Sequence, residues 1–382
     1  MIYLDYAATT PMSRSAVDAY TEAAEKFYGN SSSLHDVGTE AGRALKGGRW
    51  VIASILGVPE RGVRFTGSGS EASFLGLVSL AQANRNKGMH LITTQTEHSS
   101  VSNTFSWLER RGYSVTRLPV NSCGQVELSE ISQALRDDTI LVSVQHVNSE
   151  TGSVQPIRMI GKLLSGHQAV FHSDMVQSFC KIPVKPAEWG IQSLSVSAHK
   201  IHGPKGLGAA YLDPSVSWSP FIPGSVHENS FRPGTVDVPA VVSFAAAARE
   251  ADSEKVAILD HVQGLKKTLL SELEKRCKRT VIIQGSPERS SPYITGLSIY
   301  GMEGQYVMLE CSQRGLAMST GSACQVNEQK PSPTLLAMGK SEQEARSFIR
   351  LSMDRQTTRS EIEEAVEILA GVVEKHLKTV RI

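Results

Sequence analysis

The stretch SLSVSAHKIHGPKGLGAAYL, residues 193–212, contains the pattern that decides the fold. Its first half alternates apolar and small polar residues, which is typical of a strand, and this run leads directly into Lys200. A GPKG turn at 203–206 follows. A lone lysine before a loop is usually a surface residue. A functional role for Lys200 therefore depends on whether the preceding segments supply a matching site.

Strand-like and helix-like segments alternate from about residue 60 to 212. One helix-like stretch runs from Ser70 to Ala83 and has an apolar face. Such alternation predicts an α/β fold with a mostly parallel central sheet and helices on both faces. These sheets form their sites at the carboxyl ends of the strands. Residues at or just after the ends of strand-like runs are Gly67, His98, His146, Asp174 and His199.

The C-terminal part has a different pattern, with a long helix expected from about Pro239 to Lys278 and two strand-like runs after it. The last helix begins at a capping box formed by Thr358 and Glu361. We therefore expect a large domain over 13–240 and a smaller α+β domain over 241–382, with residues 1–12 packing back on the smaller one.

Composition excludes several classes of protein. The 382 residues carry 39 basic and 38 acidic side chains without a long basic block, so no nucleic-acid partner is implied. The N-terminus lacks the basic and apolar regions of a secretory signal, and no apolar run approaches the roughly 18 residues of a membrane-spanning helix. We expect a cytoplasmic protein. Its five cysteines form no CxxC pair, which gives no support for a metal site.

The segment FTGSGSEAS, residues 65–73, lies between a predicted strand and a predicted helix. Its small residues would let backbone N–H groups approach a phosphate, whose charge the helix N-terminus favours. An ordinary glycine-rich turn is the alternative interpretation. The spacing does not fit GxGxxG, which argues against a nicotinamide-dependent dehydrogenase.

The run SAHKxxGPKGxG resembles the Schiff-base lysine segment of the fold-type I pyridoxal-phosphate (PLP) enzymes, in their class V aminotransferase branch. The resemblance implies the PLP-transferase fold, PLP as cofactor and a Schiff base on Lys200. A neutral amine is needed to attack the aldehyde, so the pKa of this lysine should be lowered. The resemblance also assigns Ser197 and His199 to the cofactor site, and Gly69 and Ser70 to the phosphate.

Two further segments match the same family. In TEHSSV, residues 96–101, His98 matches the histidine that stacks on the pyridine ring and moves protons. In HSDMVQS, residues 172–178, Asp174 matches the aspartate that keeps the pyridine nitrogen protonated, so that the ring withdraws electrons. Gln177 matches the glutamine that donates to the phenolic oxygen.

The segment HVNSETGSVQPI, residues 146–157, resembles a family run with two successive asparagines before the glutamate. Asn148 keeps the first asparagine, and Ser149 replaces the second, which contacts the phenolic oxygen of the cofactor. A serine is shorter but can still donate a hydrogen bond. Both residues are therefore candidates for the cofactor site.

Two C-terminal matches concern the partner subunit and the substrate. FRPGT, residues 231–235, resembles a segment whose threonine, here Thr235, reaches the cofactor phosphate of the neighbouring subunit, so the resemblance implies a homodimer. In IRLSMDR, residues 349–355, Arg350 matches the arginine that binds the substrate carboxylate. The planar guanidinium of an arginine can donate two parallel hydrogen bonds to a carboxylate. The family commonly has glycine where Asp354 stands.

The motif STGSAC places Cys324 among small and polar residues, which is typical of an exposed loop, whereas Cys311 lies in a helix-like run and is expected in the core. STGSAC is similar to the persulfide-bearing motif of the NifS/IscS-type cysteine desulfurases. The implied reaction converts L-cysteine to L-alanine. It leaves the sulfane sulfur on Cys324, whose thiolate must form. An acceptor protein, in iron–sulfur cluster assembly or other sulfur trafficking, then takes the sulfur.

Three other functions remain possible at this point. A selenocysteine lyase would use the same cofactor chemistry, and the sequence does not distinguish sulfur from selenium. A plain class V transaminase would not need Cys324 on a loop, so this cysteine makes a transaminase the weaker alternative. A non-catalytic PLP-binding scaffold for sulfur transfer would not need Lys200, His98 and Asp174 together, so their joint presence argues against this function.

Overall fold

The computed structural model describes residues 1–277, 280–321 and 331–380. Its helices are α1 (Arg14–Lys26), α2 (Asp36–Leu56), α3 (Gly69–Ala83), α4 (Ser99–Glu109), α5 (Leu128–Ala134), α6 (Ile157–Leu164), α7 (Val238–Cys277), α8 (Gly304–Gln313), α9 (Pro333–Ala337), α10 (Glu342–Arg346) and α11 (Arg359–Val380). Its strands are β1 (Ile2–Tyr3), β2 (Val63–Thr66), β3 (His90–Thr94), β4 (Ser114–Leu118), β5 (Thr139–Ser143), β6 (Val170–Asp174), β7 (Ser193–Ser197), β8 (Gly208–Leu212), β9 (Val281–Gln284), β10 (Ile294–Ile299), β11 (Leu316–Ala317) and β12 (Phe348–Ser352). None of these helices is both long and apolar enough to cross a membrane.

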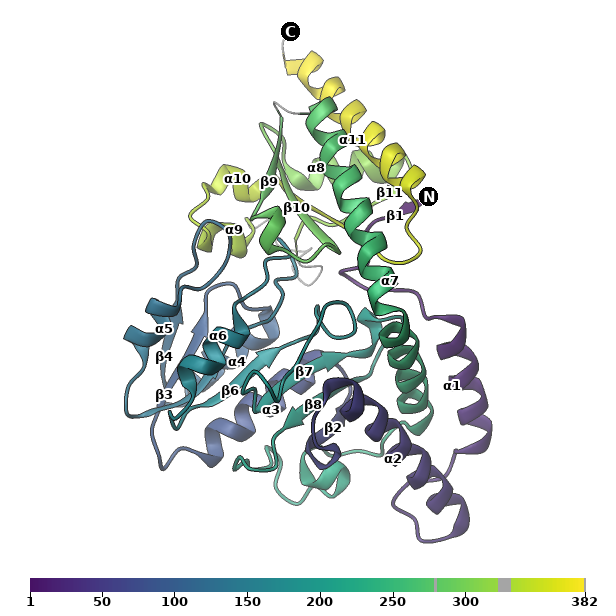
Figure 1. Ribbon diagram of the computed structural model, residues 1–382, viewed down its shortest axis with the longest axis vertical. Coiled ribbons are helices and arrows are strands. Elements are labelled where there is room, and N and C mark those ends of the chain that lie inside the picture. The colour runs from purple at the N-terminus through teal and green to yellow at the C-terminus, as the bar shows by residue number, and fades with distance from the viewer. Residues whose placement is uncertain (278–279, 322–330, 381–382) are drawn as a thin grey trace.

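A seven-stranded sheet forms the lower half of the molecule in Figure 1. Its strand order is β2-β8-β7-β6-β5-β3-β4. Strand β8 is antiparallel to both of its neighbours, and the other pairs are parallel. The predicted α/β fold with a mostly parallel central sheet is therefore confirmed.

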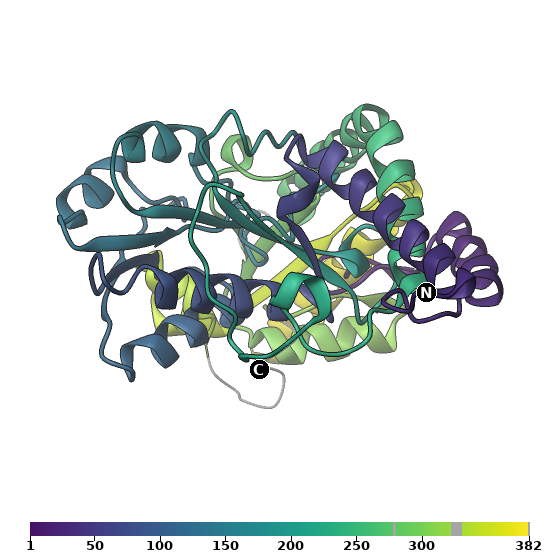
Figure 2. The same ribbon diagram turned by 90° about the horizontal axis from the view of Figure 1, so that it is seen from below.

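Both faces of this sheet are covered, as the view from below shows (Figure 2). Neighbouring residues of one strand point into different cores, because side chains alternate across a strand. Leu141 belongs to the core beside α3 and α4, whereas Val142 belongs to the core that α2 and the first part of α7 cover. Because both faces are covered, every residue of β3, β5, β6, β7 and β8 is buried, including the small polar serines and threonines.

The upper part of the molecule contains a three-stranded antiparallel sheet of order β12-β10-β9, packed against α8, α11 and the second part of α7 (Figure 1). The N-terminal strand β1 pairs in parallel with β11, and Leu4 is fully buried in this core. The 40-residue helix α7 joins the two parts, because Phe244 packs in a core of the large sheet and Leu265 in the core of the small sheet. The division into two domains near residue 240 stays a prediction.

Candidate active site

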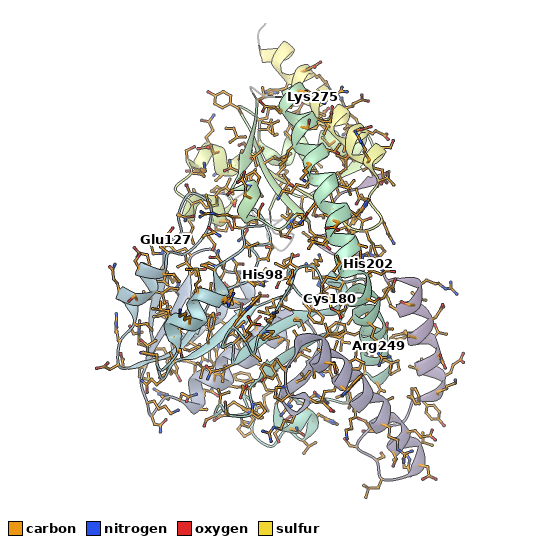
Figure 3. All side chains as sticks on the ribbon, viewed as in Figure 1. His98, Glu127, Cys180, His202, Arg249 and Lys275 are labelled. Atoms are coloured by element: carbon orange, nitrogen blue, oxygen red, sulfur yellow. The ribbon has the colours of Figure 1, made fainter. Side chains whose placement is uncertain are left out.

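A cavity of about 170 Å³ lies where the parallel strands of the large sheet end. The segments that follow β2, β3, β5, β6 and β7 all contribute to its wall, as expected for the carboxyl edge of such a sheet. The N-terminal segment and β12 close it from the side of the small sheet. Figure 3 shows His98 near this junction between the two parts. The residues around the cavity are Ala7, Ala8, Ser68, Gly69, Ser70, His98, Ser100, Gln145, Val147, Ser149, Asp174, Val176, Gln177, Ser197, His199, Lys200 and Arg350.

Lys200 ends a short 3₁₀ turn, Ala198–Lys200, that follows β7 directly. Its Nζ atom donates to the carbonyl oxygens of Ala7, at 2.7 Å, and of Ala8, at 2.8 Å. The lysine is thus held at the cavity by the N-terminal segment. A primary amine in this place is able to form a Schiff base with an aldehyde once it has lost its proton.

His98 caps the N-terminus of α4. Its Nδ1 atom accepts the backbone N–H of Ser100 at 3.2 Å and lies 2.8 Å from the hydroxyl oxygen of Ser100. Since Nδ1 is an acceptor, the neutral imidazole carries its proton on Nε2. Burial lowers the pKa of His98, with a smaller contribution from Lys200, although the charge of Asp174 opposes both. The ring is therefore neutral at neutral pH and can accept or give a proton.

Asp174 ends β6, and its Oδ1 atom accepts the N–H of Val176 at 2.9 Å. Burial raises the pKa of this carboxyl, while His98, the Val176 N–H group and Lys200 act in the opposite direction. A cationic group placed in the cavity would stabilise the carboxylate further. Gln177 lies on the next turn, where its Nε2 atom donates to the Ala7 carbonyl at 2.9 Å, and its buried Oε1 atom has no hydrogen-bond partner among the described residues.

Helix α3 begins at Gly69, at the edge of the cavity. Ser68 caps this helix by accepting the N–H of Glu71 at 3.0 Å, which leaves the first N–H groups of the helix available to a ligand. A Cβ atom on Gly69 would lie 2.9 Å from Val176 and 3.0 Å from Ser197, so a larger residue does not fit. The buried hydroxyl of Ser197 also has no partner within the described part of the chain. This end of the cavity suits a phosphate group.

Arg350 lines the cavity from the middle of β12 and is 1% exposed. One guanidinium nitrogen donates to the carbonyl oxygen of Ser149 at 2.9 Å, and the other donates to Asp5 at 2.7 Å. The buried Nε–H group has no partner in the described residues. A guanidinium that retains N–H groups beside a cavity can bind a carboxylate.

Most of the predicted site residues converge on this cavity, but two described ones do not line it. The Oδ1 atom of Asn148 accepts the N–H groups of Glu150 and Thr151 in its own loop at 2.9 Å, and its Nδ2 atom donates to the carbonyl of Thr96, in the segment after β3, at 3.1 Å. Thr235 is exposed and does not line the cavity of its own chain. Cys324 lies outside the described residues.

Sequence reasoning missed Gln145 and the role of Ser100. Gln145 lines the cavity, whereas its neighbour His146 packs against Trp189 with ring centroids 5.3 Å apart. Both follow β5. The expectation that sites form at the carboxyl ends of parallel strands therefore pointed to this segment, but it did not show which of the two residues faces the cavity. The alternation of side chains was the signal that could have separated them.

The arrangement fits PLP on four independent features. Lys200 provides the amine for its aldehyde, and the N-terminus of α3 provides N–H groups for its phosphate. Asp174 is a buried carboxyl that a protonated pyridine nitrogen would stabilise, and Gln177 has polar atoms beside the same space.

Comparison with known proteins gives the same result. Residues 2–365 match the model of the aminotransferase class-V family. The chain is 42% identical to the putative cysteine desulfurase NifS of Halalkalibacterium halodurans over 98% of this chain and 99% of that protein. It is 34% identical to the cysteine desulfurase IscS of Dictyoglomus turgidum over 99% and 96% of the two chains.

Solved structures are similar over nearly the same length. A NifS-like protein with 29% identity superposes with a TM-score of 0.91 and covers 98% of this chain and 99% of its own. SspA, solved in complex with cysteine, has 31% identity, a TM-score of 0.82 and coverage of 94% and 100%. The cavity, its lysine and these matches agree: the chain belongs to the class-V aminotransferase family and, within it, to the PLP-dependent cysteine desulfurases of the NifS/IscS type.

Proposed function

We propose that this chain converts L-cysteine to L-alanine and receives the sulfur on Cys324 as a persulfide. The observation that carries the proposal is the convergence of Lys200 and Arg350 on one cavity. A lysine that can carry the cofactor aldehyde and an arginine that can bind a carboxylate match the amino and carboxylate groups of an α-amino acid. The family relationship supports cysteine as that amino acid.

Each residue has a defined task in this reaction. PLP, when bound, supplies an electron sink that makes the α-proton of the substrate acidic. Arg350 holds the substrate carboxylate in the fork of its guanidinium. Lys200, as a neutral amine, takes the α-proton, and His98 assists because it is neutral and carries its proton on Nε2. Asp174 holds the proton on the pyridine nitrogen.

Cys324 completes the reaction as a nucleophile. Its thiolate attacks the sulfur of the bound cysteine, so that a sulfur–sulfur bond forms and the carbon–sulfur bond breaks. The β-carbon, which loses sulfur, and the α-carbon each take up a proton, and L-alanine leaves. The persulfide then passes its outer sulfur to the thiol of an acceptor protein, in iron–sulfur cluster assembly or another sulfur pathway.

The proposed enzyme is a cytoplasmic homodimer. Thr235 supports this assembly, because it is exposed and does not line the cavity of its own chain, so it is available to a partner. Ile222 and Val226, 47% and 78% exposed, lie in the segment that leads to Thr235. Leu34 is 99% exposed, and a second copy of the chain would bury such apolar side chains.

Incubation of the PLP-loaded protein with L-cysteine, followed by assays of alanine and of persulfide, tests the proposal. We expect alanine and protein-bound persulfide to form together in a first turnover, and a thiol reductant to sustain further turnover. A parallel assay with L-selenocysteine separates a desulfurase from a selenocysteine lyase. Absence of alanine from L-cysteine would refute the proposal, and alanine from L-selenocysteine alone would identify the lyase.

A further inference from the structure

One short N-terminal segment contacts two of the residues that line the cavity, Lys200 and Arg350. Ala7 and Ala8 accept the hydrogen bonds of the Lys200 amine, and Asp5 accepts the bond from the Arg350 guanidinium at 2.7 Å. Lys200 is the residue that would hold the cofactor aldehyde until the amino group of the substrate replaces it, and Arg350 is where we place the substrate carboxylate. The contact between Asp5 and Arg350 is therefore close to the point at which the substrate is recognised.

The backbone fixes Asp5 relative to Arg350. Asp5 forms a parallel bridge with Ser352, which follows Arg350 by two residues in β12. The N–H of Ser352 donates to the Leu4 carbonyl at 2.8 Å, and its hydroxyl oxygen accepts the N–H of Ala7 at 2.9 Å. The residues on both sides of Asp5 are thus bonded to the strand that carries the arginine. The carboxylate and the guanidinium are held at a set distance.

Burial makes the carboxylate of Asp5 important to the arginine. The Arg350 side chain is 2% exposed and that of Asp5 is 19% exposed. A buried cation without a partner is costly, so loss of this carboxylate would leave Arg350 to rotate or to recruit another anion. Asp5 and the Ser149 carbonyl each occupy one N–H group of the guanidinium, and these two bonds fix its orientation. The remaining N–H groups, including that on Nε, are left to a third acceptor.

We propose that Asp5 is a positioning residue for substrate recognition: it holds the Arg350 guanidinium so that the unused N–H groups meet the substrate carboxylate. Its own charge also compensates the buried arginine when no substrate is bound. The proposal rests on the role of Arg350 in the proposed function. Asp5 acts through Arg350 and does not itself change the reacting bonds.

The test compares a ligand that has a carboxylate with one that lacks it. PLP-loaded wild-type protein and the variants Asp5→Ala, Asp5→Asn and Arg350→Ala are titrated with L-alanine and with L-alaninamide, and the absorbance of the bound cofactor reports binding. Because a hydrogen bond to a charged group is lost, Asp5→Ala should weaken binding of L-alanine by about tenfold or more and that of L-alaninamide by less than about twofold. Asp5→Asn keeps an acceptor oxygen at the same place and should restore binding of L-alanine to within about threefold of the wild type.

Steady-state kinetics provide a second readout. The KM for L-cysteine should rise in Asp5→Ala in parallel with the weaker binding of L-alanine, while kcat changes by less than about threefold, because the lost interaction only positions the substrate. Asp18→Ala removes an exposed acid of α1 and serves as the matched control. Asp5→Ser, whose side chain is too short for the same contact, replaces the alanine variant if that variant does not retain cofactor.

Each failure has a different meaning. If Asp5→Ala binds L-alanine as the wild type does, or weakens both ligands equally, Asp5 does not position Arg350 and the inference is wrong. If Arg350→Ala itself fails to discriminate between the two ligands, the assignment of Arg350 in the proposed function is wrong, and the inference falls with it. Discrimination that is lost in both Arg350→Ala and Asp5→Ala and recovered in Asp5→Asn is the result that supports the proposal.

Discussion

The carboxylate of Glu150 accepts a hydrogen bond from the hydroxyl of Thr334 at 3.1 Å. Its second oxygen accepts the hydroxyl of Ser332, so one buried side chain next to Ser149 holds the start of α9. Burial raises the pKa of Glu150, while the two hydroxyl groups and Arg350 act against that rise. The segment at 331–334 directly follows the part of the chain that contains Cys324. Glu150 thus links the wall of the cavity to a segment distant in sequence.

Removal of the Glu150 carboxylate should destabilise the protein. In Glu150→Ala the hydroxyls of Ser332 and Thr334 lose their acceptor, and each buried unsatisfied group costs about 1–3 kcal/mol. Urea unfolding should show this loss in the free energy of unfolding, with a smaller loss for Glu150→Gln, which keeps one acceptor oxygen. Glu363→Ala, on the exposed side of α11, is the control. A Glu150→Ala variant as stable as the wild type would show that other groups satisfy the two hydroxyls.

Replacement of Lys200 should abolish covalent attachment of PLP. Wild-type protein should be yellow, and borohydride reduction followed by peptide mapping should place the cofactor on Lys200, because its amine is the one held at the cavity. Lys200→Ala should show neither the absorbance nor the labelled peptide. Lys205→Ala is a suitable control, since that lysine is exposed in the turn that follows. A labelled peptide that contains another lysine would contradict this assignment.

The sequence predicts much of the site because each parallel strand ends at the same edge of the sheet. His98, Asp174 and Lys200 were found in this way, and the family resemblance named their roles. The contacts that hold these residues in place could not be predicted from the sequence. Ala7 and Ala8 act through backbone carbonyls, which no side chain identifies.

Long-range pairs and local turns account for the remaining differences. Asp5 meets Arg350 across 345 positions of the chain, a contact that strand and helix periodicity cannot show. Asn148 has a side chain that can bond its own loop or reach outward. In the structure its Oδ1 atom accepts the N–H groups of Glu150 and Thr151, and its Nδ2 atom donates to the Thr96 carbonyl, so both ends of the amide are bonded to residues that do not line the cavity.

Two buried histidines should make stability depend on pH. Burial lowers the pKa of His146 to about 4 and that of His172 to about 3. Because these values lie below that of an unfolded chain, about 6.5, the unfolded state binds more protons as the pH falls. The free energy of unfolding should therefore decrease from about pH 6.5 towards pH 4, and these two groups should contribute no pH dependence above about pH 7.5.

Denaturant unfolding at a series of pH values measures this effect. In His146→Gln the loss of free energy of unfolding between about pH 6.5 and pH 4 should be smaller than in the wild type by up to roughly 3 kcal/mol. This difference does not depend on how the substitution changes stability at pH 7. His167→Gln, at a partly exposed position, is the control. An unchanged slope in His146→Gln would mean that the folded protein can protonate this ring without loss of stability.

The last prediction separates the sulfur carrier from the cofactor site. The described residues around the cavity already include the amine, the carboxyl and the helix N-terminus proposed to hold PLP, so Cys324→Ser should fold, bind PLP and show the absorbance of the wild type. Its alanine production should fall to near background, because a hydroxyl is a poor nucleophile towards sulfur and a thiolate is a good one. Mass spectrometry after brief exposure to L-cysteine should find no added sulfur on the protein.

Two other cysteines provide the controls for this experiment. Cys311 is fully buried, and burial raises the pKa of its thiol to about 12, so it keeps its proton at neutral pH and cannot attack. Cys123 is partly exposed, so its replacement tests whether an accessible thiol is sufficient. Cys311→Ser and Cys123→Ser should both produce alanine at close to the wild-type rate. If Cys324→Ser does so as well, the persulfide mechanism is wrong, and a lyase that needs no thiol becomes the better description.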